Sequence, residues 1–389
     1  MTTTINNEQK KLNVPNLRFK EFQGEWEMCK FKDVCSTSTG NKNTQDKIDD
    51  GIYPFYVRSQ TVEHINSWTF DGEAILTAGD GVGVGKVFHH TYGKIGVHQR
   101  VYILSNFKCD ANYLFHFFSS HFYNRVKRMS AKNSVDSVRK EMITEMPLYL
   151  PSKQEQTKIG VLLSLLDERI STQNKIIDKL QSLIKGLNDS LYAQYGDKVL
   201  TSFAELGTSY SGLSGKSAQD FGFGKPFITY LNVYSNNVIN ENEFQYVAIK
   251  DDEKQNVAEY GDVLFTLSSE TPREVGIGSV YLGKEKVYLN SFCFGIHITN
   301  MEVAFPPYLS YYVSSTAFRK FIYPYAQGST RFNLCKADFE KASIKLPTLE
   351  NQKRIYLILG HIDCKIETER QLLALYNSQK QYLLRQMFI

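Results

Sequence analysis

The sequence has no long apolar run and no signal-peptide pattern. Its most apolar stretch, residues 159–166, contains Gly160 and Ser164, so no segment reaches the ~18 apolar residues of a membrane span. Residues 1–13 are polar and lack the apolar segment of a secretory signal. We therefore expect a soluble, intracellular protein that works in the cytoplasm.

Cysteines are few and follow no ligand or disulfide pattern. None of the six forms a Cys-x-x-Cys pair, so a zinc site or a disulfide framework has no support in the sequence. Most lie inside apolar segments, which predicts reduced cysteines that serve as small core residues. The six are Cys29, Cys35, Cys109, Cys293, Cys335 and Cys364.

Catalytic motifs are also missing. The glycine-rich residues 78–86 fail as a phosphate loop because Asp80 stands where a glycine is required and Val87 where Ser or Thr is required. A tight hairpin is the better interpretation. Residues 304–308 resemble the tetrapeptide of amino-methyltransferases, but Phe305 cannot accept the required hydrogen bond. The eight histidines show no metal-ligand spacing. We expect no catalytic residue and no metal in this chain, and a binding function.

Length and aromatic content predict large folded domains. The 389 residues suggest two or three domains, and 25 Phe, 24 Tyr and 2 Trp are enough for substantial cores. A hydrophobic fraction of 42% is too high for intrinsic disorder.

The chain repeats itself. Residues 150–159 (LPSKQEQTKI) recur 196 positions later as residues 346–355 (LPTLENQKRI). Weaker matches precede them: residues 82–88 with 275–281, and Pro54-Phe55 with Pro226-Phe227, at offsets of 193 and 172. Drifting offsets indicate one fold with loops of different length. We divide the chain into globular domains at 1–150 and 196–345, and helices at 151–195 and 346–389.

Both helical segments follow a heptad. Steps of four and three residues land on apolar side chains, apart from one polar position in the same place in each copy, Gln173 and Glu369. This indicates a coiled-coil seam; two ordinary core helices are the alternative. The first seam contains Ile159, Leu163, Leu166, Ile170, Gln173, Ile177 and Leu180, continuing to Ile184, Leu187 and Leu191. The second contains Ile355, Leu359, Ile362, Ile366, Glu369 and Leu373, continuing to Tyr376, Lys380, Leu383 and Met387.

The globular halves mix strands and helices. Residues 74–77, 101–104 and 263–266 are β-branched and aromatic-rich and predict strands. Residues 111–129 and 307–323 predict helices with aromatic faces. Because no strict strand–helix–strand alternation appears, the fold class is α+β.

Several segments together resemble one family, the specificity subunits of type I restriction-modification enzymes. The opening residues 14–19 (VPNLRF), with Phe22, Gly24 and Trp26, are similar to that family's start. The repeated Leu-Pro-x-x-x-x-Gln-x-x-Ile is similar to the entry into its conserved helices. Residues 328–334 resemble the end of its second recognition domain, with 133–138 as a weaker counterpart.

This resemblance implies a non-catalytic subunit that reads double-stranded DNA. Two tandem-repeated globular target recognition domains would each read half of an asymmetric, two-part site, separated by two long helices that form an antiparallel coiled coil. Two methyltransferase subunits and motor-nuclease subunits would be its partners and would carry S-adenosylmethionine, ATP and magnesium. The alternatives are a coiled-coil protein scaffold, a fused methyltransferase or nuclease, and a recognition subunit without a motor-nuclease partner.

Charge suggests dependence on those partners. The total is +4, with +3 in residues 1–150 and −2 in residues 196–345, whereas a self-sufficient DNA binder usually has a strong basic excess. Candidate DNA contacts are polar residues in predicted loops or at strand ends, each of which could instead be solvated or contact phosphate. They are Arg58, Ser59, Gln60, Lys86, His98, Gln99 and Arg100 in the first half, and Thr229, Tyr230, Asn232, Thr271, Arg273, Arg331 and Asn333 in the second.

The heptad segments also suggest a spacing role. A helix over residues 154–191 would be ~57 Å long, enough to span half-sites about 34–36 Å apart. Inserting or deleting four residues near Gln173 should therefore change the gap between half-sites and leave each half-site unchanged.

Overall fold

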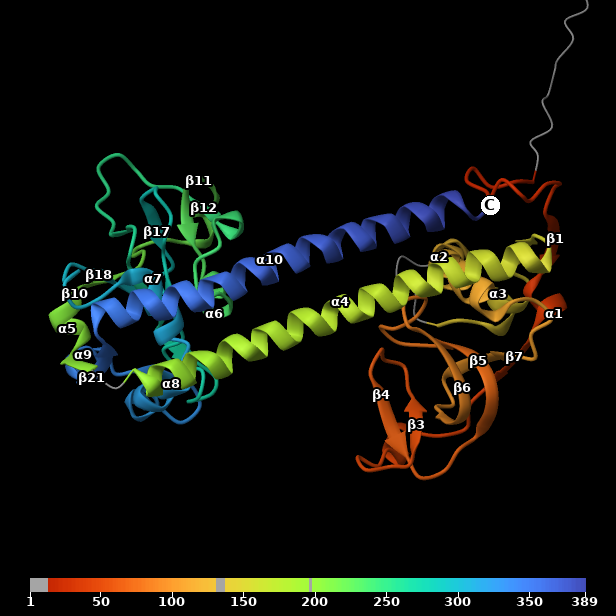
Figure 1. Ribbon diagram of the computed structural model, residues 1–389, viewed down its shortest axis with the longest axis horizontal. Coiled ribbons are helices and arrows are strands. Elements are labelled where there is room, and N and C mark those ends of the chain that lie inside the picture. The colour runs from red at the N-terminus through yellow and green to blue at the C-terminus, as the bar shows by residue number, and fades with distance from the viewer. Residues whose placement is uncertain (1–12, 131–136, 196–197) are drawn as a thin grey trace, which may run out of the picture. The chain divides into compact units, whose positions relative to one another are not determined.

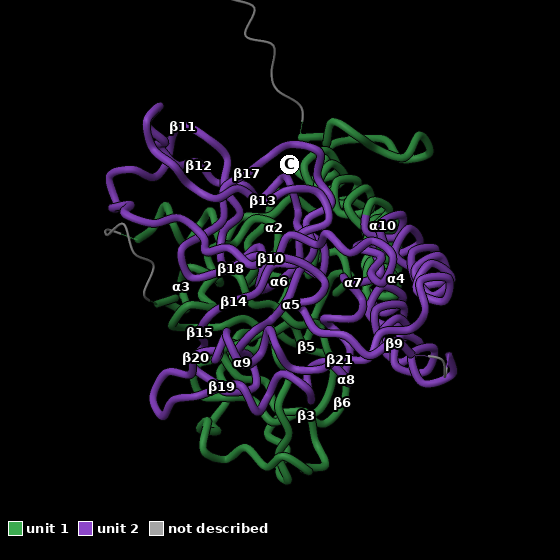
Figure 2. The backbone as a smooth tube through the Cα atoms, turned by 90° about the vertical axis from the view of Figure 1, so that its left-hand side faces the viewer, with its two compact units in different colours: residues 1–174, 371–389 green, residues 175–370 purple. Residues whose placement is uncertain are grey.

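The computed structural model describes residues 13–130, 137–195 and 198–389. The chain forms two compact units, coloured separately in Figure 2: unit 1 contains residues 1–174 and 371–389, and unit 2 contains residues 175–370. The borders fall after Asn174 and after Arg370, which are 196 positions apart. Each long helix is therefore divided between the units at the same place in the repeat.

Unit 1 contains a six-stranded sheet with the order β2-β7-β5-β6-β3-β4 and a two-stranded ribbon, β1-β8. Neighbouring strands are antiparallel except β3 and β6. The elements before the first long helix are β1 (Glu27–Lys30), α1 (Phe31–Val34), β2 (Ser36–Thr39), β3 (Tyr53–Tyr56), β4 (Val62–Ile65), β5 (Phe70–Ala78), β6 (Phe88–Val97), β7 (Val101–Ser105), α2 (Ala111–Met129), α3 (Lys140–Thr144) and β8 (Pro147–Leu150).

Unit 2 distributes the same frame over four sheets, with the orders β10-β18-β14-β16, β12-β11-β17-β13, β15-β20-β19 and β21-β9. Its elements are β9 (Lys198–Thr201), α5 (Phe203–Leu206), β10 (Gly207–Ser211), β11 (Phe221–Ile228), α6 (Tyr230–Ser235), β12 (Gln245–Val247), β13 (Val257–Ala258), β14 (Val263–Thr266), β15 (Ser268–Ser269), β16 (Gly278–Val280), β17 (Val287–Leu289), β18 (Cys293–Ile298), α7 (Pro306–Tyr312), α8 (Thr316–Ile322), β19 (Ala326–Gln327), β20 (Phe332–Leu334), α9 (Lys336–Lys341) and β21 (Ile344–Pro347).

Strand pairing confirms that the halves are copies of one α+β fold. In unit 1, β3 pairs with β4 antiparallel and with β6 parallel, with Phe55 opposite Gly96. In unit 2, β11 pairs with β12 antiparallel and with β17 parallel, with Phe227 opposite Tyr288. The one long strand β6 corresponds to two short ones, β16 and β17. The segment between these short strands is one source of the drifting offsets.

Two sequence predictions need correction. The glycine-rich residues do form a hairpin, but nine residues separate β5 from β6, so it is not a tight one. The helix predicted over residues 307–323 is broken into α7 and α8. Ser315 is the N-cap residue directly before α8, and its Oγ accepts a hydrogen bond from the Phe318 backbone N–H, a cap that favours a new helix start. The predicted helix 111–129 is confirmed as α2.

The two long helices are α4 (Lys153–Gln194) and α10 (Leu349–Gln386), visible in Figure 1 as uninterrupted ribbons. With 42 residues, α4 is about 63 Å long. Every predicted seam position is buried or half-buried, which confirms the heptad assignment. The polar positions Gln173 and Glu369 are buried as well, at 5% and 7% exposure.

The helices are antiparallel within each unit. In unit 1, the first half of α4 meets the end of α10, where Lys380 forms an ion pair with Asp167 and Arg169 lies 5.5 Å from the Tyr376 ring centre. In unit 2, Leu191 near the end of α4 shares a core with Ile355 near the start of α10. The coiled coil therefore belongs to both domain cores.

The cysteines only partly match expectation. All six are free thiols, and Cys35, Cys109 and Cys293 are buried core residues as predicted. Burial raises the pKa of Cys35 and of Cys109 to about 12, so these thiols stay protonated. Cys364 is exposed, so the core prediction is wrong for this residue.

Candidate nucleic-acid interface

In unit 1, one carboxylate holds two of the predicted DNA-contacting arginines. Asp80 Oδ1 accepts a hydrogen bond from Arg58 Nη1 at 2.9 Å, and its Oδ2 lies 3.7 Å from Arg100 Nε. The Arg58 and Arg100 side chains stay 45% and 65% exposed. Because each guanidinium has five N–H donors, both retain donors for a ligand.

Two hollows adjoin this arginine pair. The first has a volume of about 460 Å³ and is lined by Thr39, Gly79, Asp80, Gln99, Arg100, Tyr102, Ser137 and Val138. The second has a volume of about 310 Å³ and is lined by Thr44, Val57, Arg58, Ser59, Gly81 and Val82. Each hollow presents one of the two arginines together with hydroxyl groups, a combination suited to hydrogen bonding with phosphates or base edges.

The turn between β6 and β7 gives one correction. His98 is 5% exposed, and its Nδ1 accepts a hydrogen bond from the Arg100 backbone N–H at 3.0 Å. Burial lowers the pKa of His98, and the neighbouring Arg58 adds to this effect. The ring supports the turn, which contradicts the predicted DNA contact. Gln99 is exposed, with its Nε2 donating to Asn43 Oδ1 at 2.6 Å.

The other candidates of unit 1 lie in exposed loops. Ser59 and Gln60 follow β3, and Ser59 Oγ donates to the Thr61 carbonyl at 3.1 Å. Lys86 lies in the hairpin loop, with its Nζ 5.6 Å from the ring centre of Tyr123. These placements are compatible with the predicted contacts, which stay predictions.

In unit 2, the loop after β15 is organised around a carboxylate. Glu274 accepts hydrogen bonds from Thr271 Oγ1 at 2.9 Å, Tyr234 OH at 2.8 Å and Ser269 Oγ at 3.1 Å. These bonds, with that of Thr271 the largest, lower the pKa of Glu274. Arg273 projects from the same loop and is exposed. The loop therefore presents the Arg273 guanidinium, which forms no ion pair with any residue that the structure describes.

The segment after β11 departs from its counterpart in unit 1. Thr229 Oγ1 caps α6 by accepting from the Asn232 backbone N–H at 3.1 Å, and Tyr230 OH donates to the Ser268 carbonyl at 2.9 Å. The Asn232 side chain is fully buried, and its Nδ2 donates to the Asn240 carbonyl at 2.9 Å. This contradicts the predicted DNA contact by Asn232. The cause is α6, which follows β11 where a loop follows β3.

The segments that end the two globular halves make equivalent backbone pairings, each within its own unit. In unit 2, Asn333 pairs with Ser268, and the Leu334 N–H donates to a carbonyl of the β14–β15 segment at 2.8 Å. In unit 1, Ser137 pairs with Asp80, and the Val138 N–H donates to the Gly79 carbonyl at 2.7 Å. Positions 137 and 333 are again 196 apart. The first four residues of the predicted counterpart, 133–136, lie outside the described residues.

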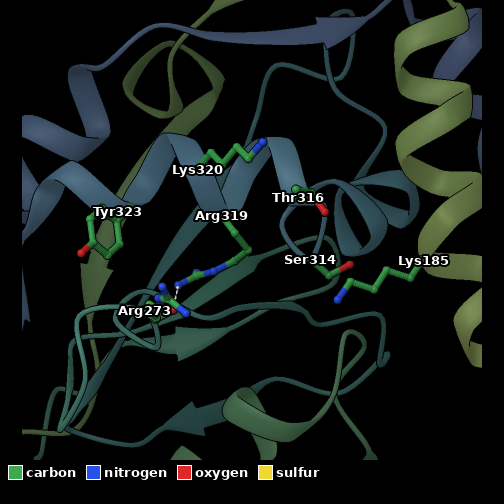
Figure 3. A pocket seen from close by; sticks show the side chains of 7 residues that line it. All are labelled: Lys185, Arg273, Ser314, Thr316, Arg319, Lys320 and Tyr323. Carbon is green, nitrogen blue, oxygen red and sulfur yellow. Dashed lines mark hydrogen bonds between the residues drawn. The ribbon is translucent and has the colours of Figure 1, made fainter.

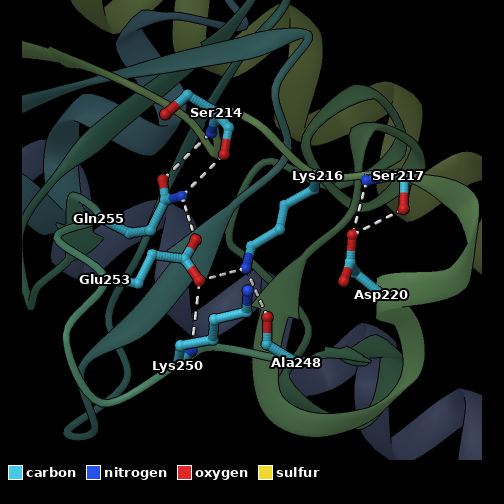
Figure 4. Close-up of polar contacts among 8 residues, drawn as sticks. All are labelled: Ser214, Lys216, Ser217, Asp220, Ala248, Lys250, Glu253 and Gln255. Carbon is cyan, nitrogen blue, oxygen red and sulfur yellow. Dashed lines mark hydrogen bonds and ion pairs between the residues drawn. The ribbon is translucent and has the colours of Figure 1, made fainter.

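The remaining unit 2 candidates flank this pairing. Asn333 and Arg331 are both exposed, the latter directly before β20. Other loops of unit 2 are held by a polar network, shown in Figure 4, in which Lys216 Nζ donates to the Ala248 carbonyl at 2.6 Å and pairs with Glu253 at 2.5 Å. Hydrogen bonding by Lys216 is the main cause that lowers the pKa of Glu253 to about 2.

The repeated glutamine explains the motif that begins each long helix. Gln156 Oε1 accepts from the Asp110 backbone N–H at 2.9 Å, and its Nε2 donates to the Pro151 carbonyl at 2.8 Å. Gln352 accepts from the Phe305 N–H at 2.8 Å and donates to the Pro347 carbonyl at 2.8 Å. Each glutamine thus ties the start of a long helix to the start of the aromatic helix of its own unit.

Sequence reasoning missed the acidic partner Asp80 and a group of basic residues in unit 2. Lys185, Arg319 and Lys320 gather with Arg273 although they come from α4, α8 and a loop. One signal was available: Arg319 and Lys320 are the only adjacent basic pair in residues 196–345, which carry a net charge of −2.

The described part of the chain contains neither a candidate metal cluster nor a candidate membrane-spanning helix. No group of three or more His, Cys, Asp or Glu side chains there could hold a metal ion. No helix there combines the length and the apolar character needed to cross a membrane.

The fold defines a class of protein: two copies of one α+β domain, each joined to an antiparallel helix pair. The model of the type I restriction modification DNA specificity domain matches twice, at residues 23–182 and 214–375. The two matches coincide with the two halves of the repeat. The chain belongs to this family of DNA specificity domains.

Relatives and solved structures agree with this assignment. The type I restriction enzyme EcoDI specificity subunit of Escherichia coli is 26% identical over 161 residues, 41% of this chain and 35% of that one. A putative type I restriction enzyme specificity subunit, MjaX of Methanocaldococcus jannaschii, is 26% identical over 285 residues, 66% of this chain and 61% of that one. These alignments span about a third and three fifths of the relatives' lengths. The crystal structure of the S subunit from M. genitalium shares the fold, with a TM-score of 0.60 at 14% identity, over 97% of this chain and 99% of that one.

Proposed function

We propose that this chain is the DNA sequence-recognition subunit of a type I restriction-modification complex. Each unit would read one half of an asymmetric, two-part site. The observation that carries this proposal is that the two units share one backbone arrangement but present different side chains on it. The strand pairings at Asp80–Ser137 and Ser268–Asn333 are equivalent, yet an arginine pair adjoins the first and a Glu274-centred loop adjoins the second. Different donors and acceptors on one scaffold favour different base sequences.

We propose that two methyltransferase subunits bind the long helices. Val161 and Leu357 occupy the same place in the repeat and are 46% and 59% exposed, although each lies between buried seam positions. An apolar side chain repeated on the outside of both helices suits two copies of one partner. Motor-nuclease subunits would join this complex for cleavage. S-adenosylmethionine would bind the methyltransferase, and ATP and magnesium would serve the partners.

We further propose that the paired helices set the length of the gap between the half-sites. Both helices are continuous across the border between the units, and every seam position in them is at least half-buried. Continuous, paired helices are stiff on the scale of one DNA turn, about 34–36 Å.

The test of function is methylation by a reconstituted complex. The chain purified with its methyltransferase partner should methylate DNA at one two-part site, mapped by sequencing of methylated bases. Neither protein should do so alone. Methylation by this chain alone would support the fused enzyme, and a stable complex that binds no DNA would support the protein scaffold.

Partner number is tested with two matched variants. Val161→Glu and Leu357→Glu should each leave one methyltransferase subunit bound in place of two, because each places a charge in one docking site. Light scattering of the purified complexes gives the stoichiometry. Two bound subunits in both variants would contradict the proposed docking sites.

A further inference from the structure

Unit 2 contains a basic pocket that includes one predicted DNA-contacting residue, Arg273, and three cations that the sequence did not single out. It has a volume of about 330 Å³ and is lined by Lys185, Arg273, Ser314, Thr316, Arg319, Lys320 and Tyr323. Figure 3 shows Lys185 reaching from α4 toward Ser314, and Arg319 pointing from α8 to the loop that carries Arg273. Four cations and, among the residues that the structure describes, no carboxylate line the pocket.

The four cations have two different roles. Arg319 donates hydrogen bonds to the carbonyls of Arg273, Val275 and Gly276 at 2.7–2.8 Å, and burial lowers its pKa. It therefore fixes the loop. Lys185, Arg273 and Lys320 are exposed and have no ion-pair partner among the described residues. These three are available to an anion.

The charge balance of unit 2 does not by itself explain why these cations lie together. Residues 196–345 carry 14 basic and 16 acidic side chains, so cations are not in excess there. Asp189 lies one turn after Lys185, and its Oδ1 accepts a hydrogen bond from the Thr316 backbone N–H at 3.0 Å. Three unpaired cations around one concave pocket repel each other unless an anion binds, so the site favours a compact, multiply coordinated anion.

We propose that this pocket binds a phosphate group of the DNA backbone. The inference rests on the proposed function, since it assigns the phosphate to the DNA that unit 2 reads. Phosphate contacts set the position of a protein on a duplex, and base contacts then specify the sequence. Because Arg319 ties the pocket to residues 273–276, a phosphate held here fixes the loop that bears Thr271 and Arg273 against its half-site.

The test is the salt dependence of DNA binding by the complex with its methyltransferase partner. In the double variant Lys185→Gln/Lys320→Gln, the slope of log affinity against log salt should become shallower by about 0.9, the contribution of one phosphate. Affinity should fall equally for duplexes with and without the target, and the methylated sequence should not change. Arg319 is left intact because it supports the loop, and thermal unfolding checks the fold.

A matched control separates the pocket from overall charge. The exposed Lys284 and Lys341 also lie in unit 2, and Lys284→Gln/Lys341→Gln removes the same two charges. Its slope should equal that of the unmodified complex. An equal change in both double variants would overturn the pocket assignment in favour of long-range charge.

The remaining outcomes distinguish the two proposals. If the unmodified complex methylates its site and the pocket variant keeps the full salt slope, the pocket does not hold DNA phosphate, although the proposed function stands. If inorganic phosphate raises the melting temperature only when Lys185 and Lys320 are present, and the DNA slope is unchanged, the ligand is a free anion. If the unmodified complex neither binds nor methylates DNA, the proposed function fails and the DNA phosphate site with it.

Discussion

A four-residue insertion in both long helices should lengthen the gap of the DNA target by about two base pairs. The insertions belong after Asn174 in α4 and after Arg370 in α10, at the borders of the units, so that the packing within each unit is kept. Both helices need the insertion because they pair. Making the third inserted residue Leu continues the apolar seam, four positions after Gln173 and Glu369.

The magnitude follows from helix geometry. Four residues add about 6 Å and turn the helix by about 400°, which is 40° beyond a full turn. B-DNA, with 10–10.5 base pairs in 34–36 Å, covers about 6 Å in roughly 1.8 base pairs and turns by about 60° over that length. If the helices run along the DNA, the mismatch in rotation is therefore about 20°. A heptad insertion adds about 10.5 Å, or roughly three base pairs, but turns the helix by −20° where the DNA turns by about 105°. Four residues should thus be tolerated better than seven, although four residues locally unwind the coiled coil.

The assay is sequencing of methylated sites in cells that express each variant with its methyltransferase partner. Both half-sites should be unchanged, and the gap should grow by about two base pairs. The sequence alone suggested that an insertion near Gln173 would be enough to change the gap. Because α4 packs against α10, an insertion in α4 alone instead shifts the register of the pair and should abolish methylation. Full methylation with the original gap in the double insertion would refute the spacing role, because the distance between the units would then not be transmitted to the DNA.

Three other predictions concern single residues. Arg58→Ala should relax methylation at the first half-site alone, by about 1–3 kcal/mol of discrimination if Arg58 reads a base, and equal loss at both half-sites would indicate a role in folding or assembly. Gln352→Ala should destabilise the fold by about 2–4 kcal/mol in urea unfolding, since it leaves the half-buried Phe305 N–H and the buried Pro347 carbonyl without this partner. Gln381→Ala, on the exposed face of α10, should change little. Burial lowers the pKa of His116 to about 4, so below pH 6.5 the unfolded chain binds a proton that the folded chain excludes until about pH 4. The free energy of unfolding should therefore fall by about 3 kcal/mol between pH 6.5 and pH 4. His116→Gln should remove that part of the pH dependence.

Long-period sequence patterns predicted the frame well. The heptads are visible in sequence because burial along a helix recurs every three to four residues, and each seam position from Ile159 to Leu191 is buried or half-buried as expected. The repeated Gln156 and Gln352 were visible for a related reason. Each makes the same pair of backbone hydrogen bonds, and only a side chain with both an acceptor and a donor can make them.

Site residues were harder to predict because their surroundings come from distant segments. Asn232 and Gln60 occupy aligned positions, 172 residues apart, yet one is buried in α6 and the other is exposed in a loop. The alignment holds through the strand residues Phe55 and Phe227, where backbone pairing is shared, and fails directly after them. His98 looked like a loop residue, but the strand pairing around it buries its ring. Neither fact follows from local composition.

These successes and failures have one physical cause, which also bears on how the protein's specificity can change. The backbone arrangement that both units share is held by contacts between groups of the same unit. These contacts are the helix seam, the glutamine hydrogen bonds and the pairings of Ser137 and Asn333 with the hairpin segments. Groups in such contacts cannot be replaced singly without leaving buried polar atoms unpaired, so both copies keep them. The side chains around Asp80 and Glu274 bond to one another, and the arginines beside them are exposed, so each set can be exchanged as a group. A set such as Arg58, Asp80 and Arg100 can therefore differ completely from its counterpart while the backbone that presents it stays the same. On this basis, transferring the loops of one unit to a relative should transfer a half-site, provided that the carboxylate moves together with the cations it holds.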